Sequence, residues 1–293
     1  MKILYITNHH SIAMASGGFV SDYQNDLVFY GLRELWGDTV VDSTQIISLY
    51  QEYEGKIHPR HLWGGMTTFW LIGENQIDRN NIEEKIKDQY YDLVIYGSIR
   101  RCKDYYALVS HCYPDHQIIL IDGNDDPELD PLHEKHLYFK REMRNDRCDH
   151  SNVLPITFGI PTGKLAKPNR NKIQEYATCV PGRPETYVFE NEQDYYEDYQ
   201  QSYYGITMKK AGWDALRHYE ILGNYCVPYF IGLENCPEQT LANLPKDLLL
   251  EARDLVWDFD EAQYFNLLDE LFNYTCNNLT TKHLAQYILN HCS

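Results

Sequence analysis

The sequence lacks the cysteine spacing of a zinc module or a disulfide framework. Its 8 cysteines are scattered along 293 residues, and no two of them are separated by only two residues. Zinc knuckles and small disulfide-rich secreted domains both need closely spaced pairs. We therefore expect reduced thiols and a cytoplasmic protein.

Long apolar runs are also missing. No stretch approaches the roughly 20 apolar residues that a transmembrane helix needs. The apolar start, Met1 to Thr7, is too short for the hydrophobic core of a secretion signal. The sequence therefore predicts no membrane span, and residues 2–7 are better explained as the first strand of a parallel sheet.

Positive charge is scarce. The chain has 26 lysine and arginine residues against 43 aspartate and glutamate residues, which gives a formal net charge of -17. A general nucleic-acid binder or an anionic-membrane binder needs a basic face, so both classes are disfavoured. A local basic pocket for a nucleotide is still compatible with this composition. Tyrosine is abundant at 25 residues, and its flat ring and hydroxyl suit sugars and bases.

The glycine-rich dinucleotide fingerprint GxGxxG is absent. The first strand is instead followed by a long loop, 8–18, and then by a helix predicted near 20–36. Loops in this position carry ligands in α/β sheets. His10 is therefore a candidate catalytic residue. Gly17 and Gly18 are candidate binding residues, because they would let a ligand approach the backbone closely. The adjacent histidine pair in this loop lacks a third ligand at usable spacing, so no metal site is predicted.

Strands and helices alternate through the first part of the chain. Strands are predicted at 92–96 and 117–121, and helices near 80–89 and 103–111. This alternation is typical of a parallel, doubly wound sheet.

An acidic turn, Asp122-Gly123-Asn124-Asp125-Asp126, follows the strand at 117–121. The carboxyl edge of a parallel sheet is its usual functional edge, so Asp122 and Asp125 are candidate catalytic bases. A cation site is a second interpretation, although the ligand spacing of an EF-hand is absent. An ordinary turn rich in aspartate and asparagine is the third.

A linker is predicted at 162–172, where glycine, proline, asparagine and lysine gather. We expect a first domain over residues 1–162 and a second over residues 163–293, with the last helix packing back on the first domain. The second domain begins with a strand near 174–181 that leads to Arg183, a candidate donor-binding residue. Further helices are predicted at 190–202, 246–255, 260–274 and 280–291.

The chemistry of the second domain is concentrated in residues 203–230. A short strand leads into a basic loop with Lys209, Lys210 and Gly212, and a helix is predicted over 212–223. Free backbone N–H groups, the helix dipole and fixed positive charge would all favour an anion at this helix start. These three loop residues are therefore candidates for donor binding.

Arg217 and Glu220 lie near the same predicted helical stripe as Lys210. In that position Arg217 would hold phosphate oxygens and Glu220 would accept hydrogen bonds from ribose hydroxyls. The alternative is a surface helix on which Arg217 and Glu220 form a solvated ion pair. The spacing alone leaves both interpretations open.

Four segments resemble, in their order, the glycosyltransferase family 1-like proteins, which include CgeB-type and exostosin-like glycosyltransferases. They are Tyr96-Gly97-Ser98, Asp122 to Asp126, Tyr138 to Glu142 and Gly212 to Leu222. The resemblance covers most of the chain between about residues 90 and 255. It implies an α/β protein of the GT-B architecture, in which two Rossmann-like domains have parallel sheets that face each other across a cleft.

The resemblance also implies different binding roles for the two domains. The second domain would hold a nucleotide-sugar donor, with Glu220 on the ribose and Lys210 and Arg217 toward the diphosphate, and the first domain would bind the acceptor. Such enzymes generally need no metal and no cofactor besides the nucleotide-sugar co-substrate. The chain departs from the pattern at Gly212, where many retaining members carry a second glutamate, and at residues 224–228, which alter the usual glycine-proline ending.

We therefore expect a metal-independent glycosyltransferase that moves a sugar from a nucleotide-diphosphate sugar to a hydroxyl acceptor, such as a glycan. Two other classes remain open. One is an epimerase or hydrolase of the same fold, which needs no separate acceptor. The other is a nucleotide- or glycan-binding module without catalytic activity.

Overall fold

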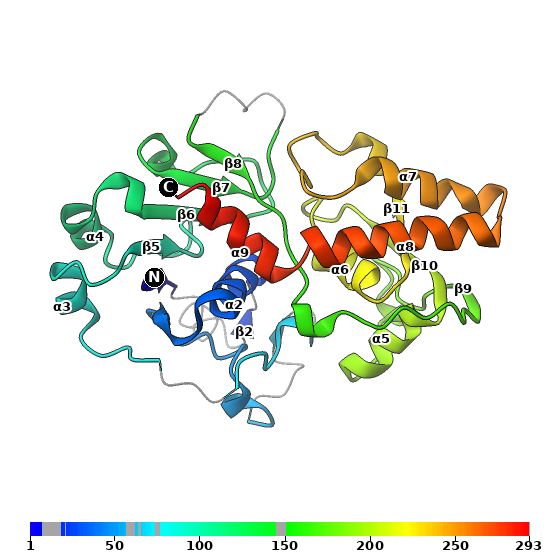
Figure 1. Cartoon of the computed structure of the whole chain (residues 1–293), viewed down its shortest axis with the longest axis horizontal. Helices are drawn as coiled ribbons and strands as arrows, with labels where there is room; N and C mark the ends of the chain where they lie inside the picture. Colours follow the sequence, from blue (N-terminus) through cyan, green and yellow to red (C-terminus); the bar gives the residue numbers. More distant parts are fainter. Residues whose placement is uncertain are drawn as a thin grey trace.

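Two parallel β-sheets lie next to each other along the longest dimension of the molecule (Figure 1). The computed structural model describes residues 1–7, 19–20, 22–56, 62–63, 66–73, 77–144 and 151–292, with the backbone alone at 19–20 and 62–63. We call the first sheet with its covering helices the first unit, and the second sheet with its helices the second unit. The predicted α/β architecture with parallel sheets is confirmed in both.

The first unit contains a six-stranded sheet in the order β3-β1-β5-β6-β7-β8, and all neighbouring strands are parallel. Its strands are β1 (Ile3–Ile6), β3 (Val40–Asp42), β5 (Leu93–Tyr96), β6 (Ile118–Asp122), β7 (Leu137–Lys140) and β8 (Val153–Pro155). The strand order changes direction at β1, which lies between β3 and β5. In open α/β sheets, ligands bind in the crevice at such a point, outside the carboxyl ends of the strands.

Alternate residues of the first sheet enter two different cores. Ile3 packs in the core that includes α2 (Tyr23–Trp36), whereas its neighbour Leu4 packs in the core with α3 (Ile82–Lys87) and α4 (Tyr106–Cys112). Both faces of the sheet are therefore covered by helices, which explains why its strands are nearly continuous apolar runs. A separate parallel pair is formed by β2 (Phe19–Val20) and β4 (Leu62–Trp63).

The second unit contains a three-stranded parallel sheet in the order β11-β10-β9. Its elements are β9 (Gln174–Tyr176), α5 (Glu192–Gln200), β10 (Ser202–Met208), α6 (Leu216–Gly223), β11 (Val227–Ile231), α7 (Lys246–Asp254) and α8 (Glu261–Asn278). The predicted strand near 174–181 ends early, at Tyr176. Asp198 of α5 accepts hydrogen bonds from the backbone amide and hydroxyl of Thr178, which turns the chain away from the sheet.

The helix predicted over 212–223 begins four residues later, at Leu216, so this boundary was wrong. The residues before it are held by the first unit. The Asp214 amide donates to Glu142 Oε1 at 2.9 Å, and Asp214 Oδ2 accepts from the Phe158 amide at 2.9 Å. Ala215 is extended (φ -142°, ψ 139°), so these long-range contacts prevent an earlier helical turn.

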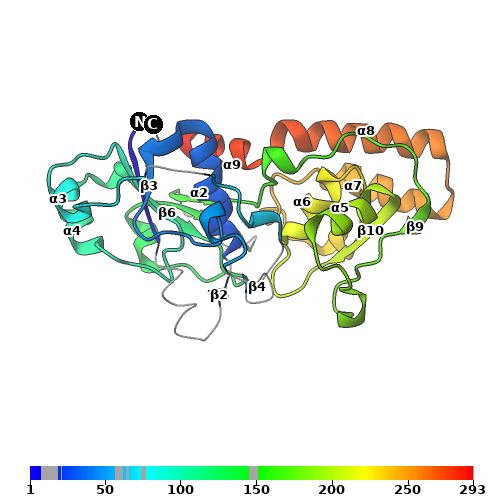
Figure 2. The same ribbon diagram turned by 90° about the horizontal axis from the view of Figure 1, so that it is seen from below.

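The last helix, α9 (Thr281–Asn290), lies against α2 of the first unit. A Cβ atom at Gly31 of α2 would lie 2.0 Å from the Thr281 carbonyl oxygen, so glycine is what permits this close approach. The chain thus crosses between the units twice, first between β8 and β9 and again between α8 and α9. Figure 2 shows α8 and α9 along the side of the molecule where both termini lie.

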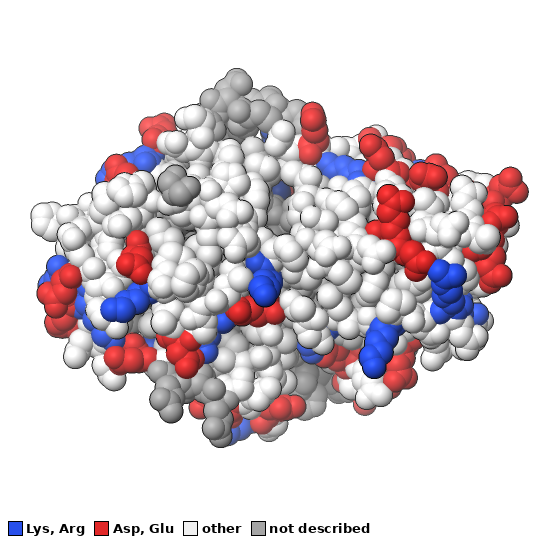
Figure 3. Space-filling model, in the orientation of Figure 1, with Lys and Arg blue, Asp and Glu red and all other residues white. Residues whose placement is uncertain are grey.

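None of the helices in the described ranges combines the length and the apolar character that a membrane span requires. On the face in Figure 3, lysine and arginine side chains occur singly or in small groups and form no continuous basic area. This face has no surface of the kind that a general nucleic-acid binder uses.

Candidate functional site

Two adjacent cavities lie at the junction of the units, beyond the carboxyl ends of strands from both sheets. The first, which we call the Arg217 cavity, has a volume of about 500 Å³; the second, the Asp125 cavity, has about 310 Å³. They share four lining residues: Tyr23, Lys210, Ala215 and Leu216. Because they have walls in common, one extended ligand or two reacting molecules can occupy them together.

The wall that the second unit contributes carries two cations, Lys210 and Arg217. Lys210 lines both cavities and is exposed, and Arg217 lines the Arg217 cavity. Among the described residues, no carboxylate forms an ion pair with either of them. The Arg217 Nη2 donates to the Tyr187 hydroxyl at 3.1 Å, and its buried Nε has no hydrogen-bond partner in the described part of the chain. This wall is suited to an anion.

Aromatic side chains surround Arg217. Tyr187, Phe189 and Tyr195 line the same cavity, and the Arg217 guanidinium lies 5.4 Å from the centre of the Tyr187 ring. Tyr187 remains 46% exposed, so its ring is available to a ligand. Flat rings beside a cation suit a ligand that joins a planar base to a phosphate.

Glu220 lines the Arg217 cavity but is 4% exposed. Its carboxylate accepts hydrogen bonds from the Thr67 hydroxyl and, at 2.7 Å, from the Tyr195 hydroxyl. Burial raises the pKa of Glu220, and the hydrogen bonds from Thr67 and Tyr195 oppose this rise. A solvated surface pair with Arg217 does not describe this arrangement, because Glu220 is buried and is bonded to hydroxyl groups.

The wall contributed by the first unit has charges that are paired. Arg101 forms an ion pair with Asp22 at 2.8 Å, and Arg141 forms one with Asp125. The Arg141 side chain is only 3% exposed, whereas that of Asp125 is 52% exposed and reaches the Asp125 cavity. Asp125 is therefore the aspartate of the acidic turn that a ligand can contact.

Asp122 is placed differently from Asp125. It is 1% exposed and lines neither cavity. Its carboxylate forms an ion pair with Lys140 at 3.0 Å, and it accepts hydrogen bonds from the Tyr138 hydroxyl at 2.6 Å and the Asn124 amide at 3.0 Å. In this position Asp122 fixes the ends of β6 and β7, and a substrate does not reach it.

Gly212 lies in the Asp125 cavity wall, close to the first unit. A Cβ atom there would lie 2.6 Å from Glu142 Oε1 and 2.9 Å from Asp125 Oδ1. A larger residue at this position would therefore displace the Glu142 or Asp125 carboxylate.

Two further predicted residues, Lys209 and Arg183, line neither cavity. Lys209 is exposed, and its ammonium lies 5.2 Å from the Trp213 ring centre. Arg183 is exposed in the turn before Pro184 and lines neither cavity. The predictions for His10, Gly17 and Gly18 fall outside the described residues.

Three site residues were not predicted from the sequence: Arg141, Asp214 and Thr67. Asp214 lines the Asp125 cavity, and burial raises its pKa to about 7 although Arg141 lowers it. The Arg141 Nη1 donates to the Asp214 carbonyl at 2.7 Å. These residues meet only across the junction of the units, and no local pattern marks them. The abundance of tyrosine was the one available signal for the hydroxyl groups around Glu220.

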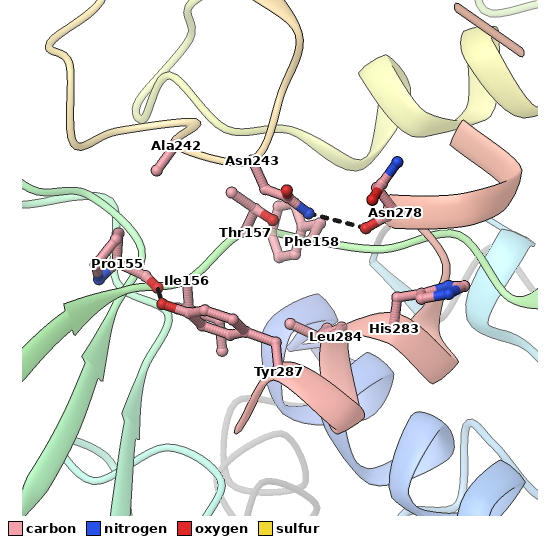
Figure 4. Close-up of a pocket in the computed structure, with 10 residues that line it drawn as sticks. All are labelled: Pro155, Ile156, Thr157, Phe158, Ala242, Asn243, Asn278, His283, Leu284 and Tyr287. Atoms are coloured by element: carbon pink, nitrogen blue, oxygen red, sulfur yellow. Dashed lines mark hydrogen bonds between the residues drawn. The ribbon is translucent and has the colours of Figure 1, made fainter. Parts of the chain in front are cut away.

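A third cavity, of about 150 Å³, lies where the two chain crossings meet (Figure 4). The Asn243 side chain donates to the Asn278 carbonyl at 2.8 Å on one side of it, and the Tyr287 hydroxyl donates to the Pro155 carbonyl at 2.9 Å on the other. Phe158 lines both this cavity and the Asp125 cavity. Its described lining residues include no lysine, arginine, aspartate or glutamate, so this cavity is unsuited to the anion that the Arg217 cavity favours.

Within the described ranges, no three histidine, cysteine, aspartate or glutamate side chains are grouped so that they would hold a metal ion. No family of known proteins matches the chain, and no curated protein matches it, so the geometry of the two cavities is what supports a functional proposal.

Proposed function

We propose that this protein is a GT-B-type glycosyltransferase that transfers a sugar from a nucleotide-diphosphate sugar to a hydroxyl acceptor. The observation that carries the proposal is a pair of cations without an ion-pair partner among the described residues, Lys210 and Arg217, beside the exposed ring of Tyr187 in a chain of net charge -17. In an acidic protein, nearby carboxylates would readily neutralise such cations. Their lack of a described counterion favours an anionic ligand.

The donor fits the Arg217 cavity in a defined direction. Its base would pack on Tyr187 and Phe189, and its diphosphate would contact Arg217 and Lys210 near the start of α6. The sugar would then point past Lys210, which lines both cavities, into the Asp125 cavity. The acceptor hydroxyl would enter from the side of the first unit.

The reaction breaks the bond between the anomeric carbon and the diphosphate oxygen. The acceptor oxygen forms a new bond to that carbon, and its proton passes to a base. Negative charge grows on the leaving diphosphate, where Arg217 and Lys210 would stabilise it. Asp125 is the candidate base, because it lines the cavity and Arg141 holds it in place.

An epimerase or hydrolase of the same fold is the alternative. It would use the Arg217 cavity in the same way but would need only a water molecule beside the sugar. The Asp125 cavity, at about 310 Å³, has room for a larger second substrate, and this favours transfer. A binding module without catalysis would leave the sugar nucleotide intact.

A thermal-shift panel of nucleoside diphosphates and nucleotide sugars tests the proposal. A ligand at a hundredfold excess over its Kd stabilises the native state by about 2.7 kcal/mol, which is readily measured. We expect at least one nucleotide to raise the Tm, and the matching nucleotide sugar to be consumed only when an acceptor is added. Consumption without acceptor would indicate an epimerase or hydrolase, and no shift with any nucleotide would count against the glycosyltransferase and the epimerase or hydrolase alike.

A further inference from the structure

The environment of Glu220 contains a contact that competes with a ligand. Thr67 belongs to the short turn Met66–Thr68 of the first unit, and it is completely buried against Glu220 and Tyr196 of the second unit. Thr67 and Glu220 are 153 positions apart in the chain. The contact is therefore a bridge between the units, made at the wall of the Arg217 cavity.

The direction of the hydrogen bonds in this bridge follows from the groups involved. A carboxylate can only accept, so the Thr67 hydroxyl donates its single proton to Glu220. The Thr67 oxygen then accepts from the Tyr196 hydroxyl, 2.6 Å away. Tyr195 donates to the other carboxylate oxygen at 2.7 Å. Two hydroxyl protons thus satisfy Glu220, one from each unit.

A ribose diol presents hydroxyl groups of the same kind, one of which can donate to the carboxylate oxygen that now accepts from Thr67. We propose that the Thr67 hydroxyl occupies the position of a ligand hydroxyl on Glu220. A ligand with a diol then binds only when the turn Met66–Thr68 withdraws from the cavity. Binding of the diol is thereby coupled to separation of the two units at this bridge. This inference rests on the proposed donor site.

Other lining residues agree with a removable turn. Met66 lines the Arg217 cavity beside Thr67, so withdrawal of the turn enlarges the cavity next to Glu220. Tyr195 and Tyr196 are both in α5 of the second unit and stay with Glu220 when the turn leaves. The carboxylate then keeps one of its two donors while the ligand replaces the other.

The test compares ribonucleotides with nucleotides that lack the diol. ADP, CDP, GDP and UDP are titrated by calorimetry beside their 2′,3′-dideoxy counterparts, into the wild type and into Thr67→Val. Valine has the shape of threonine without the hydroxyl. We expect the preference for the ribonucleotide to rise about tenfold in the variant, because a hydrogen bond to a charged group is no longer displaced. Binding of the dideoxy nucleotide should not change.

Two further variants make the result specific. Tyr196→Phe removes the hydroxyl that supports Thr67 and should change the preference in the same direction by a smaller factor; it also decides the question if Thr67→Val does not fold. Thr275→Val removes a buried hydroxyl in α8, which donates to the Leu271 carbonyl, and should leave the preference unchanged.

Each remaining outcome counts against the inference in a recognisable way. Equal preference in the wild type and Thr67→Val would overturn the competition, while the proposed function stands if Glu220→Gln still removes the preference. If Thr67→Val binds ribonucleotides and dideoxynucleotides more tightly by the same factor, the substitution has made the whole cavity more accessible. This result would also overturn the proposed competition. If no nucleotide binds any of these proteins, the proposed function and the competition fall together.

Discussion

The positive charges on the two walls of the cleft, which consists of the Arg217 and Asp125 cavities, differ in whether they have a carboxylate partner. On the wall of the first unit, Arg101 and Arg141 each have an aspartate partner. On the wall of the second unit, Lys210 and Arg217 have no carboxylate within ion-pair distance among the described residues. Paired charges hold a structure together, whereas an unpaired cation at a cavity is available to a ligand. The difference separates the cations that hold the cleft together from those that would bind a ligand in it.

The burial of the side chains supports this distinction. Arg141 is almost completely buried, and besides Asp125 it donates to the Gly123 carbonyl at 2.7 Å and to the Asp214 carbonyl at 2.7 Å. A buried guanidinium is tolerated when its donors are satisfied in this way. In contrast, the Arg217 Nε is buried without a hydrogen-bond partner in the described residues, so this donor is available to a ligand.

The largest effect on the free energy of unfolding is expected on the wall of the first unit, where the arginines are paired. Arg141→Ala should lower the free energy of unfolding by about 3–5 kcal/mol, because it leaves carboxylates at the junction without their buried counterion. Urea denaturation measures this change. Arg101→Ala is the matched control: its ion pair is partly exposed, and its loss should lower the free energy by less than about 1 kcal/mol. Equal losses in the two variants would remove the distinction between buried and exposed pairs.

On the wall of the second unit, we expect substitutions to change turnover rather than stability. Arg217→Ala should reduce donor turnover by about 10²–10³, equivalent to roughly 2–4 kcal/mol, because it removes a charge-assisted contact to the leaving diphosphate. Its Tm should stay close to that of the wild type. Steady-state kinetics and a melting curve measure both. Arg183→Ala, which removes an exposed arginine outside the cavities, should be unaffected. Near wild-type turnover in Arg217→Ala would remove the central residue of the proposal.

The junction also predicts a pH dependence of stability. Asp214 has a pKa of about 7 in the native state, against 3.8 for the ordinary side chain, so between these values the native state binds more protons than the unfolded state. Its contribution to stability is therefore fully present below about pH 4 and is lost as the pH rises through 7, by at most roughly 1.4 kcal/mol per pH unit.

Comparison with Asp214→Asn isolates this contribution, because asparagine does not titrate. The stability of the wild type relative to this variant should fall between pH 5 and pH 7.5, as measured by urea denaturation at each pH. A constant difference across this range would show that Asp214 is ionised in the native state throughout.

A smaller effect is expected from the two neighbouring lysines of the loop. Lys210→Ala should raise the Kd of a nucleoside diphosphate by about tenfold at low salt and less at high salt, because Lys210 is exposed and its attraction to phosphate is screened. Lys209→Ala should change the Kd much less, since Lys209 lies over Trp213 outside both cavities. Calorimetric titration of the two variants compares them, and a reversed order would contradict the assignment of Lys210.

The smallest effect is expected from chelation. If the cations of the second wall neutralise the diphosphate, EDTA should leave donor turnover unchanged within the error of a kinetic assay. Loss of turnover that manganese restores would show that a metal does this work, and Asp125 and its acidic turn would then be the first place to search for its ligands.

The fold could be predicted to a large extent because its signals are local. The strand at residues 117–121 is an apolar run followed by turn residues, and the structure places β6 at Ile118–Asp122. The helix start at 212 was wrong for a physical reason that is not local, since Asp214 is held by Glu142 and Phe158 of the other unit. A terminus that depends on a distant partner cannot be recognised from helical periodicity.

The residues of the candidate site also differ in whether a local sequence pattern reveals them. Lys210, Arg217 and Glu220 were selected because a basic loop before a helix has a recognisable spacing, and all three line the Arg217 cavity. Thr67 and Arg141 were not selected, because each contributes through contacts with residues far away in the chain. Asp122 and Asp125 have the same local sequence context, yet one is enclosed and the other faces the cavity.

The sequence by itself determined the parallel α/β architecture and the basic loop of the second unit, because both follow from patterns within a few turns or strands. Only the tertiary structure decided which charges are neutralised. Arg141 and Asp214 are 73 positions apart, and Thr67 and Glu220 are 153 apart. Whether a charged or polar group is free for a ligand depends on which partner the fold brings within hydrogen-bonding distance, and this distance is a property of the assembled units.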